Sequence, residues 1–243
     1  MLTNWMHDLP EHRQSLFQFR MRFKGGFMRV SFEGTGDVTA TCSANLVRIV
    51  EDDGYAIVPG CLGEETLKLL GSHLTKDSYA IRNLLALPIV RELAASGAVR
   101  TLAEAVLGKH CFAVKGTFFN KAQESNWKVA WHQDLTIMVR ERKEVIGFGP
   151  WTVKEGIVHV QPNANVLSRI LAIRLHLDAS EADNGPLRVI LGSHKQGRLS
   201  SEQIAHYPKQ GSVVCTVPRG GALLMRPLLL HASSACVHPK ARG

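Results

Sequence analysis

The sequence predicts a mainly β protein, built as a sandwich or barrel, with helices that pack on the outside of its sheet. From Cys111 onward, short segments rich in β-branched and aromatic residues alternate with Gly, Pro and Asn turns. Between residues 45 and 107, in contrast, apolar residues recur at helical spacing. The 243 residues are enough for one well-buried core, and we expect one main domain.

Composition excludes several classes of protein. Five cysteines, odd in number and widely spaced, argue against a disulfide framework or a structural zinc site, and they indicate a reducing, cytoplasmic compartment. No apolar run approaches the roughly 18 residues that span a bilayer, so no membrane association is expected. The net charge is +8, but no stripe of Lys and Arg interleaved with aromatics accompanies it. We therefore expect a basic solvated surface and no nucleic-acid partner.

The first elements in the chain are predicted to be helical. Residues 1–42 show no readable pattern and are left as an unassigned N-terminal extension. A short helix that turns at Gly54 into a strand is predicted over 46–59, and another helix over 63–70. A third helix is predicted over 89–107, with Gly108 as its stop.

The remaining elements are predicted strands, with one possible short helix at 200–206. Their lengths and turn residues are typical of a β-sandwich or barrel. The strands are expected over 112–119, 129–139, 171–177, 187–191, 212–217 and 222–230.

The strand over 129–139 contains the first candidate functional residues, His132 and Asp134. Side chains at positions i and i+2 leave a strand on the same face, so the two would point the same way. One imidazole and one carboxylate are two of the three ligands in the two-His, one-carboxylate site that binds Fe(II). Among eleven histidines this pair is a weak signal, and a third ligand is needed.

His231 is the candidate third ligand. It follows the turn at Gly220-Gly221 and an almost uninterrupted apolar stretch, so it can sit at the open end of a sandwich. Taken alone, it is more simply interpreted as a core or rim histidine. The His132/Asp134 pair makes the interpretation as a metal ligand the better one.

Four segments, in this order, resemble the phytanoyl-CoA dioxygenase family of Fe(II)- and 2-oxoglutarate-dependent oxygenases. They are Trp131–Asp134, Arg174–Asp178, Asn184–His194 and Leu228–Ser234, and the resemblance covers roughly residues 45–243. It implies a double-stranded β-helix, the cupin-like jelly roll, over residues 43–243. It also implies that His132, Asp134 and His231 bind iron.

The resemblance further implies which residues hold 2-oxoglutarate. Arg242 takes the place of the family arginine that pairs with the far carboxylate of this cosubstrate, and its planar fork suits a carboxylate. Ser233 matches a family hydroxyl that helps to hold the same carboxylate. Gln161 and Arg174 are weaker candidates for substrate contacts.

The implied reaction consumes O2 and 2-oxoglutarate, releases succinate and CO2, and hydroxylates a small-molecule substrate. Asp134 favours hydroxylation, because related halogenating enzymes carry a small residue in its place. Two departures from the family are visible. Leu191 stands where proline is usual, and family members continue past the arginine into another strand, so we expect the domain ending at Gly243 to lack its last strand.

Two other interpretations stay open. One is a cupin-like metal enzyme that uses His132, Asp134 and His231 without 2-oxoglutarate. The other is an inactive jelly-roll fragment or binding module. The sequence identifies neither the substrate nor the oligomeric state, and a fold by itself does not separate these alternatives.

Overall fold

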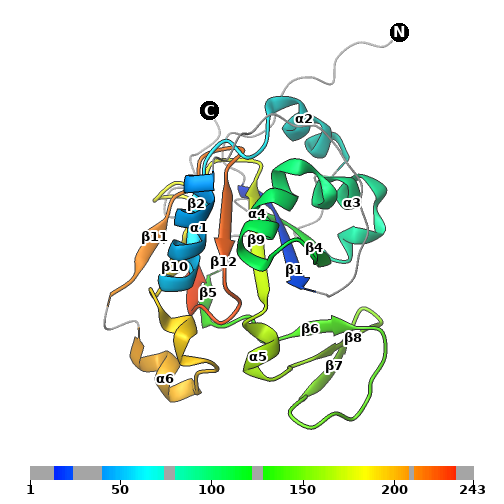
Figure 1. The fold of residues 1–243 in the computed structure, drawn as a ribbon, viewed down its shortest axis with the longest axis vertical. Helices are drawn as coiled ribbons and strands as arrows, with labels where there is room; N and C mark the ends of the chain where they lie inside the picture. Colours follow the sequence, from blue (N-terminus) through cyan, green and yellow to red (C-terminus); the bar gives the residue numbers. More distant parts are fainter. Residues whose placement is uncertain (1–13, 24–39, 74–79, 122–127, 208–210, 234–243) are drawn as a thin grey trace.

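Two antiparallel sheets form the frame of the protein (Figure 1). A computed structural model describes residues 14–23, 40–73, 80–121, 128–207 and 211–233. The six-stranded sheet has the order β2 (Tyr55–Val58), β12 (Ala222–Met225), β9 (Ile170–His176), β1 (Gln14–Phe23), β4 (Cys111–Lys121) and β3 (Ala80–Ile81). The four-stranded sheet has the order β11 (Val213–Cys215), β10 (Leu187–Val189), β13 (His231–Ser233) and β5 (Val129–His132).

A smaller three-stranded sheet extends from one end of this frame (Figure 1). It contains β6 (Ile137–Val139), β8 (Ile157–Val160) and β7 (Trp151–Lys154), in that order. Its own apolar cluster includes Ile137 and Val160 and continues into α5 (Ala164–Leu167). The extension is therefore packed onto the sandwich rather than isolated from it.

Strand β9 separates two hydrophobic cores by the alternation of its side chains. Leu171, Ile173 and Leu175 belong to the cluster under the helices, whereas Ala172 belongs to the cluster between the two sheets. Because side chains alternate along a strand, Arg174 and His176 share the face of Ala172 and point between the sheets. This inner face is the one against which the four-stranded sheet packs.

Helices cover the outer face of the six-stranded sheet, as predicted (Figure 1). They are α1 (Ala40–Asp52), α2 (Glu64–His73), α3 (Pro88–Ala95) and α4 (Gly97–Leu107), and the short α6 (Ser201–His206) lies apart from them. The single helix predicted over 89–107 is wrong. Ser96 adopts an extended conformation, and its backbone N–H and hydroxyl both donate to the Leu93 carbonyl, which ends α3. Gly108 does stop α4.

The strand predicted over 222–230 is also wrong in its extent, and the difference determines where His231 lies. Strand β12 ends at Met225 because Pro227 has no N–H to donate to a neighbouring strand, and the Leu229 N–H donates to the Arg226 carbonyl at 3.0 Å, which closes a turn. The chain thereby leaves the six-stranded sheet and begins β13, in the four-stranded sheet, at His231.

Part of the N-terminal extension has a defined place in the fold. Strand β1, residues 14–23, pairs antiparallel with β4 on one side and with β9 on the other. It therefore lies inside the six-stranded sheet, although its sequence alone did not indicate an element.

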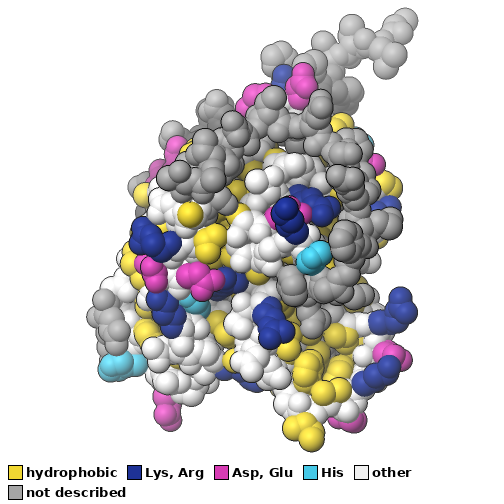
Figure 2. All heavy atoms as spheres, in the orientation of Figure 1, with side chains coloured by type: hydrophobic (Ala, Val, Ile, Leu, Met, Phe, Trp, Pro, Cys, Tyr) yellow, Lys and Arg dark blue, Asp and Glu magenta, His cyan; other side chains and the backbone are white. Residues whose placement is uncertain are grey.

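On the surface, acidic and basic side chains are mixed across the face shown in Figure 2. Within the described residues, the helices are too short or too polar to cross a bilayer.

We predict that Gly54→Ala destabilises the protein more than Gly60→Ala does. Both glycines have positive φ angles, 88° and 65°, so alanine at either position is strained by about 1 kcal/mol. A Cβ on Gly54 would also lie 2.5 Å from His194 Nδ1 and 2.6 Å from Leu229 Cδ1, whereas one on Gly60 has nothing within 4 Å. Urea unfolding should show a loss of at least about 2 kcal/mol for Gly54→Ala, counting strain and overpacking together. Equal losses in the two variants would contradict the packing described here.

A second prediction concerns acid stability and His176, which is only 4% exposed. Burial, reinforced by the charge of Arg174, lowers the pKa of His176 to about 3. The unfolded chain binds this proton near the usual pKa of about 6.5, so the contribution of His176 to stability is complete above that pH and is lost as the pH falls towards 3. The free energy of unfolding of the metal-free protein should therefore fall between pH 7 and pH 5.

The variant His176→Leu isolates this contribution. It should remove roughly 1 kcal/mol per pH unit from that fall, measured by urea unfolding at each pH. The neighbouring Leu175 provides the control, since Leu175→Met alters the packing of the same strand but removes no titrating group, and it should leave the pH dependence unchanged. A pH dependence identical in His176→Leu and the parent would show that this histidine is protonated normally in the folded protein.

Candidate metal centre

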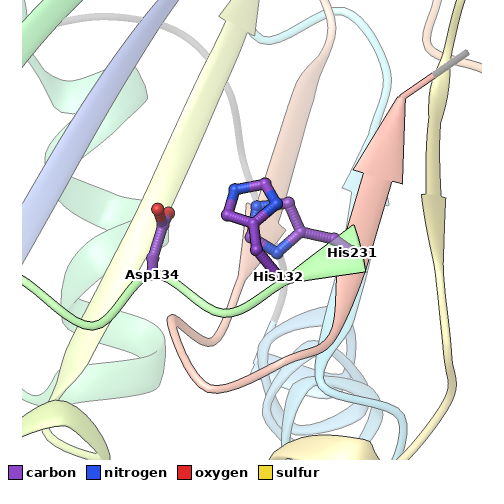
Figure 3. A group of neighbouring side chains, drawn as sticks. All are labelled: His132, Asp134 and His231. Atoms are coloured by element: carbon purple, nitrogen blue, oxygen red, sulfur yellow. The ribbon is translucent and has the colours of Figure 1, made fainter. Parts of the chain in front are cut away.

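The register between β13 and β5 brings the two candidate histidine ligands together. His231 pairs directly with His132 across this antiparallel pair. Their ring centroids are 4.2 Å apart, and the ring planes are tilted by 49° (Figure 3). Two residues far apart in the sequence thus present their imidazoles to the same space, as predicted.

Asp134 completes the group from the segment that follows β5 (Figure 3). The predicted strand over 129–139 is interrupted here, because the Asp134 N–H donates to the Pro227 carbonyl at 2.8 Å instead of continuing a ladder with a neighbouring strand. Ligand atoms of His132, Asp134 and His231 all lie within 4.8 Å of one another. Bonds of about 2 Å to one ion require only short side-chain adjustments from this arrangement.

Both histidines are held in the tautomer that a metal ligand needs. Nδ1 of His132 lies 2.8 Å from the Ala130 carbonyl oxygen, and Nδ1 of His231 lies 2.9 Å from that of Leu229. A carbonyl oxygen only accepts, so Nδ1 carries the proton in each ring. In the neutral imidazole, Nε2 then keeps its lone pair for an ion.

The environment keeps His231 neutral. Burial lowers the pKa of its imidazole to about 4, although the nearby Asp134 carboxylate opposes this shift. At neutral pH no proton therefore competes with a metal ion for the ring. His231 is 4% exposed, whereas His132 and Asp134 are half-buried, so solvent reaches the group at His132 and Asp134.

Gln133 holds the two ligand-bearing segments together, and the sequence analysis missed it. Its Nε2 donates to the carbonyls of Leu228 at 2.6 Å and Gly197 at 2.8 Å, and its Oε1 accepts from the Leu199 N–H at 2.9 Å. Its position between His132 and Asp134 could have indicated this role, because alternation along the chain turns the Gln133 side chain to the face opposite the two ligands. A glutamine buried there must satisfy both ends of its amide.

The other predicted site residues occupy different positions. Ser233 lies on β13 and pairs with Leu187 of β10. Gln161 accepts a hydrogen bond from Arg198 at 2.7 Å, and Arg174 lies on the inner face of β9. Arg242 lies outside the described residues. The structure thus brings together the three predicted metal ligands, and it leaves the role of Arg242 a prediction.

We predict that Gln133→Leu weakens metal binding. The substitution leaves two carbonyls and one N–H without their partner and loosens the Leu228 segment relative to His132. Titration with Co(II) should show a 10- to 100-fold loss of affinity, the usual effect of removing a group that orients metal ligands.

The exposed Gln196 supplies the control. Gln196→Leu should bind Co(II) like the parent. Unchanged affinity in Gln133→Leu would mean that the glutamine stabilises the fold without positioning the ligands.

Comparison with known proteins agrees with this geometry. The family model described as phytanoyl-CoA dioxygenase matches residues 76–243, a segment that contains all three candidate ligands. Ectoine dioxygenase of Stutzerimonas stutzeri (strain A1501) is 23% identical over 249 residues, which cover 84% of this chain and 75% of that protein.

Solved structures show the same fold. Apo EctD from S. alaskensis superposes with a TM-score of 0.61 at 20% identity, covering 90% of this chain and 79% of that one. The non-heme α-ketoglutarate-dependent epimerase SnoN gives a TM-score of 0.56 at 17% identity, covering 83% and 79%. EctD has also been solved with bound Fe, and with 2-oxoglutarate and 5-hydroxyectoine. The predicted jelly roll is confirmed, and because the family model matches well over half of the sequence, the chain belongs to the phytanoyl-CoA dioxygenase family.

Proposed function

We propose that this protein is an Fe(II)- and 2-oxoglutarate-dependent dioxygenase that hydroxylates a small-molecule substrate. The proposal is carried by one observation, the convergence of His132, Asp134 and His231 at a single point between the sheets. Membership of a family that uses Fe(II), 2-oxoglutarate and O2 supports it.

The three side chains fit Fe(II) by their chemistry. Two neutral imidazoles and one carboxylate form the ligand set of non-heme Fe(II) oxygenases, and no cysteine is near enough to join the group among the described residues. Bound there, the metal would supply the activation of O2 for oxidative decarboxylation of the cosubstrate and oxidation of the substrate. The carboxylate of Asp134 offsets one of the two positive charges of the ion.

The protein's own contribution is to fix ligand geometry. The carbonyls of Ala130 and Leu229 hold the rings of His132 and His231, and Gln133 ties the segment from His132 to Asp134 to the Leu228 carbonyl. Ligands already oriented before the metal arrives need little rearrangement to bind it. We assign Ser233 and Arg242 to the far carboxylate of 2-oxoglutarate, and Gln161 and Arg174 to contacts with the substrate.

Hydroxylation is the outcome that Asp134 favours, although a protein with a similar fold carries out another reaction. SnoN, a structural neighbour, is an epimerase. The carboxylate occupies the position that a halide would need, which excludes halogenation by the same site. Product analysis is therefore part of the test.

Anaerobic addition of Fe(II) and 2-oxoglutarate should produce the weak visible charge-transfer band of the chelate, and exposure to O2 should yield succinate. His132→Ala removes one of three ligands, so the band should vanish and succinate formation should fall at least 100-fold, a change of about 3 kcal/mol. His73→Ala, at an exposed histidine, should match the parent. No band and no succinate in the parent would contradict the proposal and leave the cupin-like enzyme and the inactive module as the alternatives.

The variant Arg242→Ala distinguishes the proposed enzyme from a cupin-like enzyme that does not use 2-oxoglutarate. It should weaken 2-oxoglutarate binding at least tenfold in the proposed enzyme, because a bidentate charged contact is lost. A cupin-like enzyme that turns over without 2-oxoglutarate would be unaffected.

A further inference from the structure

Arg174 is a cation placed between the two sheets. In β9 it pairs in register with Leu223 of β12, and Leu223 belongs to the cluster between the sheets. The same face of β9 carries Ala172 and His176, both buried. The Arg174 side chain therefore extends from the large sheet towards the small sheet, which carries His132 and His231.

The Nε of Arg174 differs from the guanidinium of Arg226 in its hydrogen bonding. The Arg174 Nε is buried and has no hydrogen-bond partner among the described residues, and the same is true of Nδ1 in its neighbour His176. Arg226 offers a comparison within the chain, since its guanidinium donates to Glu51 at 2.6 Å and to the Ser168 carbonyl at 3.2 Å. Among the described residues, the fold thus supplies acceptors to the guanidinium of Arg226 and none to the Nε of Arg174, and the Nε of Arg188 on the small sheet is likewise without one.

Arg174 is also electrostatically linked to the candidate metal centre. Burial lowers the pKa of its guanidinium, and the Asp134 carboxylate acts in the opposite direction. The positive charge of Arg174 in turn helps to lower the pKa of His231 and of His176. Guanidinium remains protonated in proteins, so this is a fixed positive charge beside the metal ligands.

A buried charged group without its hydrogen bonds destabilises a fold, and a ligand that supplies the missing acceptor removes this penalty. The planar fork of arginine matches a carboxylate, which can accept from two of its N–H groups at once. We propose that Arg174 binds a carboxylate of a ligand in the space between the sheets, beside His132, Asp134 and His231. The proposal rests on the function proposed above and specifies its ligand chemistry.

The carboxylate can come from an anionic substrate or from the far end of 2-oxoglutarate. The two sources differ in a measurable way, because pyruvate has the same chelating 2-oxo acid as 2-oxoglutarate but no far carboxylate. Hexanoate, added after 2-oxoglutarate, serves as a probe for a separate carboxylate. The test uses the full chain, with Co(II) as a metal whose absorption reports ligand binding.

Arg174→Met removes the charge and keeps the length of the side chain. Co(II) affinity should stay within threefold of the parent. If Arg174 holds 2-oxoglutarate, the variant binds it at least tenfold more weakly and binds pyruvate unchanged. If it holds the substrate, 2-oxoglutarate and pyruvate bind unchanged, and hexanoate binding to the Co(II)/2-oxoglutarate complex weakens at least tenfold. Either result supports a carboxylate site.

The stability of the ligand-free protein distinguishes a ligand-binding role of Arg174 from a structural one, because the two roles predict opposite changes in the urea midpoint of Arg174→Met. Arg174→Met should leave the urea midpoint of the ligand-free protein unchanged or raise it, because an unsatisfied buried charge is removed. Arg226→Met, in contrast, should lower the midpoint, because it removes the donor to the part-buried Ser168 carbonyl and the ion pair with Glu51.

Two results would overturn the proposal. One is a markedly lower urea midpoint for Arg174→Met, and the other is parent-like binding of 2-oxoglutarate together with no Arg174-dependent binding of hexanoate. Failure of the proposed function looks different, since the parent itself would then not bind 2-oxoglutarate in the presence of Co(II). In that case hexanoate binding to metal-free parent and variant, followed by tryptophan fluorescence, still decides for or against the carboxylate site.

Discussion

The antiparallel pairing of β13 with β5 is the interaction on which the candidate site depends. It sets His231 opposite His132, and it does so because the chain crosses from one sheet to the other between Met225 and His231. A slip of one residue in this register would turn one imidazole to the opposite face of the small sheet. The site therefore requires the correct register between β13 and β5 as well as the correct side chains.

The crossover that makes this pairing possible is itself anchored at several points. The Pro227 carbonyl accepts from the Asp134 N–H, the Leu228 carbonyl accepts from Gln133, and the Leu229 carbonyl accepts from the His231 ring. Three consecutive carbonyls thus each hold part of the site. Proline at 227 frees this stretch from the sheet, and the carbonyls that a ladder would have used become available to orient ligands.

The sequence predicted the sandwich, its outer helices and all three residues that converge, because alternation of apolar residues and the motif around His132 are local signals. It did not predict where strands break. The turn at Arg226–Leu229 and the end of α3 at Ser96 depend on hydrogen bonds that form only in the folded chain. Strand β1 was missed because its pairing with β4 and β9 joins segments far apart in sequence. Gln133 was missed for the same reason, since its partners belong to other segments.

The proposed assignments give the site, with metal ion and 2-oxoglutarate bound, a net charge of one positive unit. A divalent ion with Asp134 leaves one net positive charge, and the two arginines, Arg174 and Arg242, raise it to three. 2-Oxoglutarate neutralises two of these and leaves one. In a partly buried space between two sheets, charge interactions are stronger than in bulk water, so the remaining positive charge favours a substrate with one negative group. The Asp134 carboxylate would bind the metal ion, and it also interacts with the positive charge of Arg174. An anion bound at Arg174 would offset that charge and would thereby change the electrostatic environment of Asp134 and of the metal. A coupling of this kind links occupancy of the substrate position to the chemistry of the metal without any movement of the ligands.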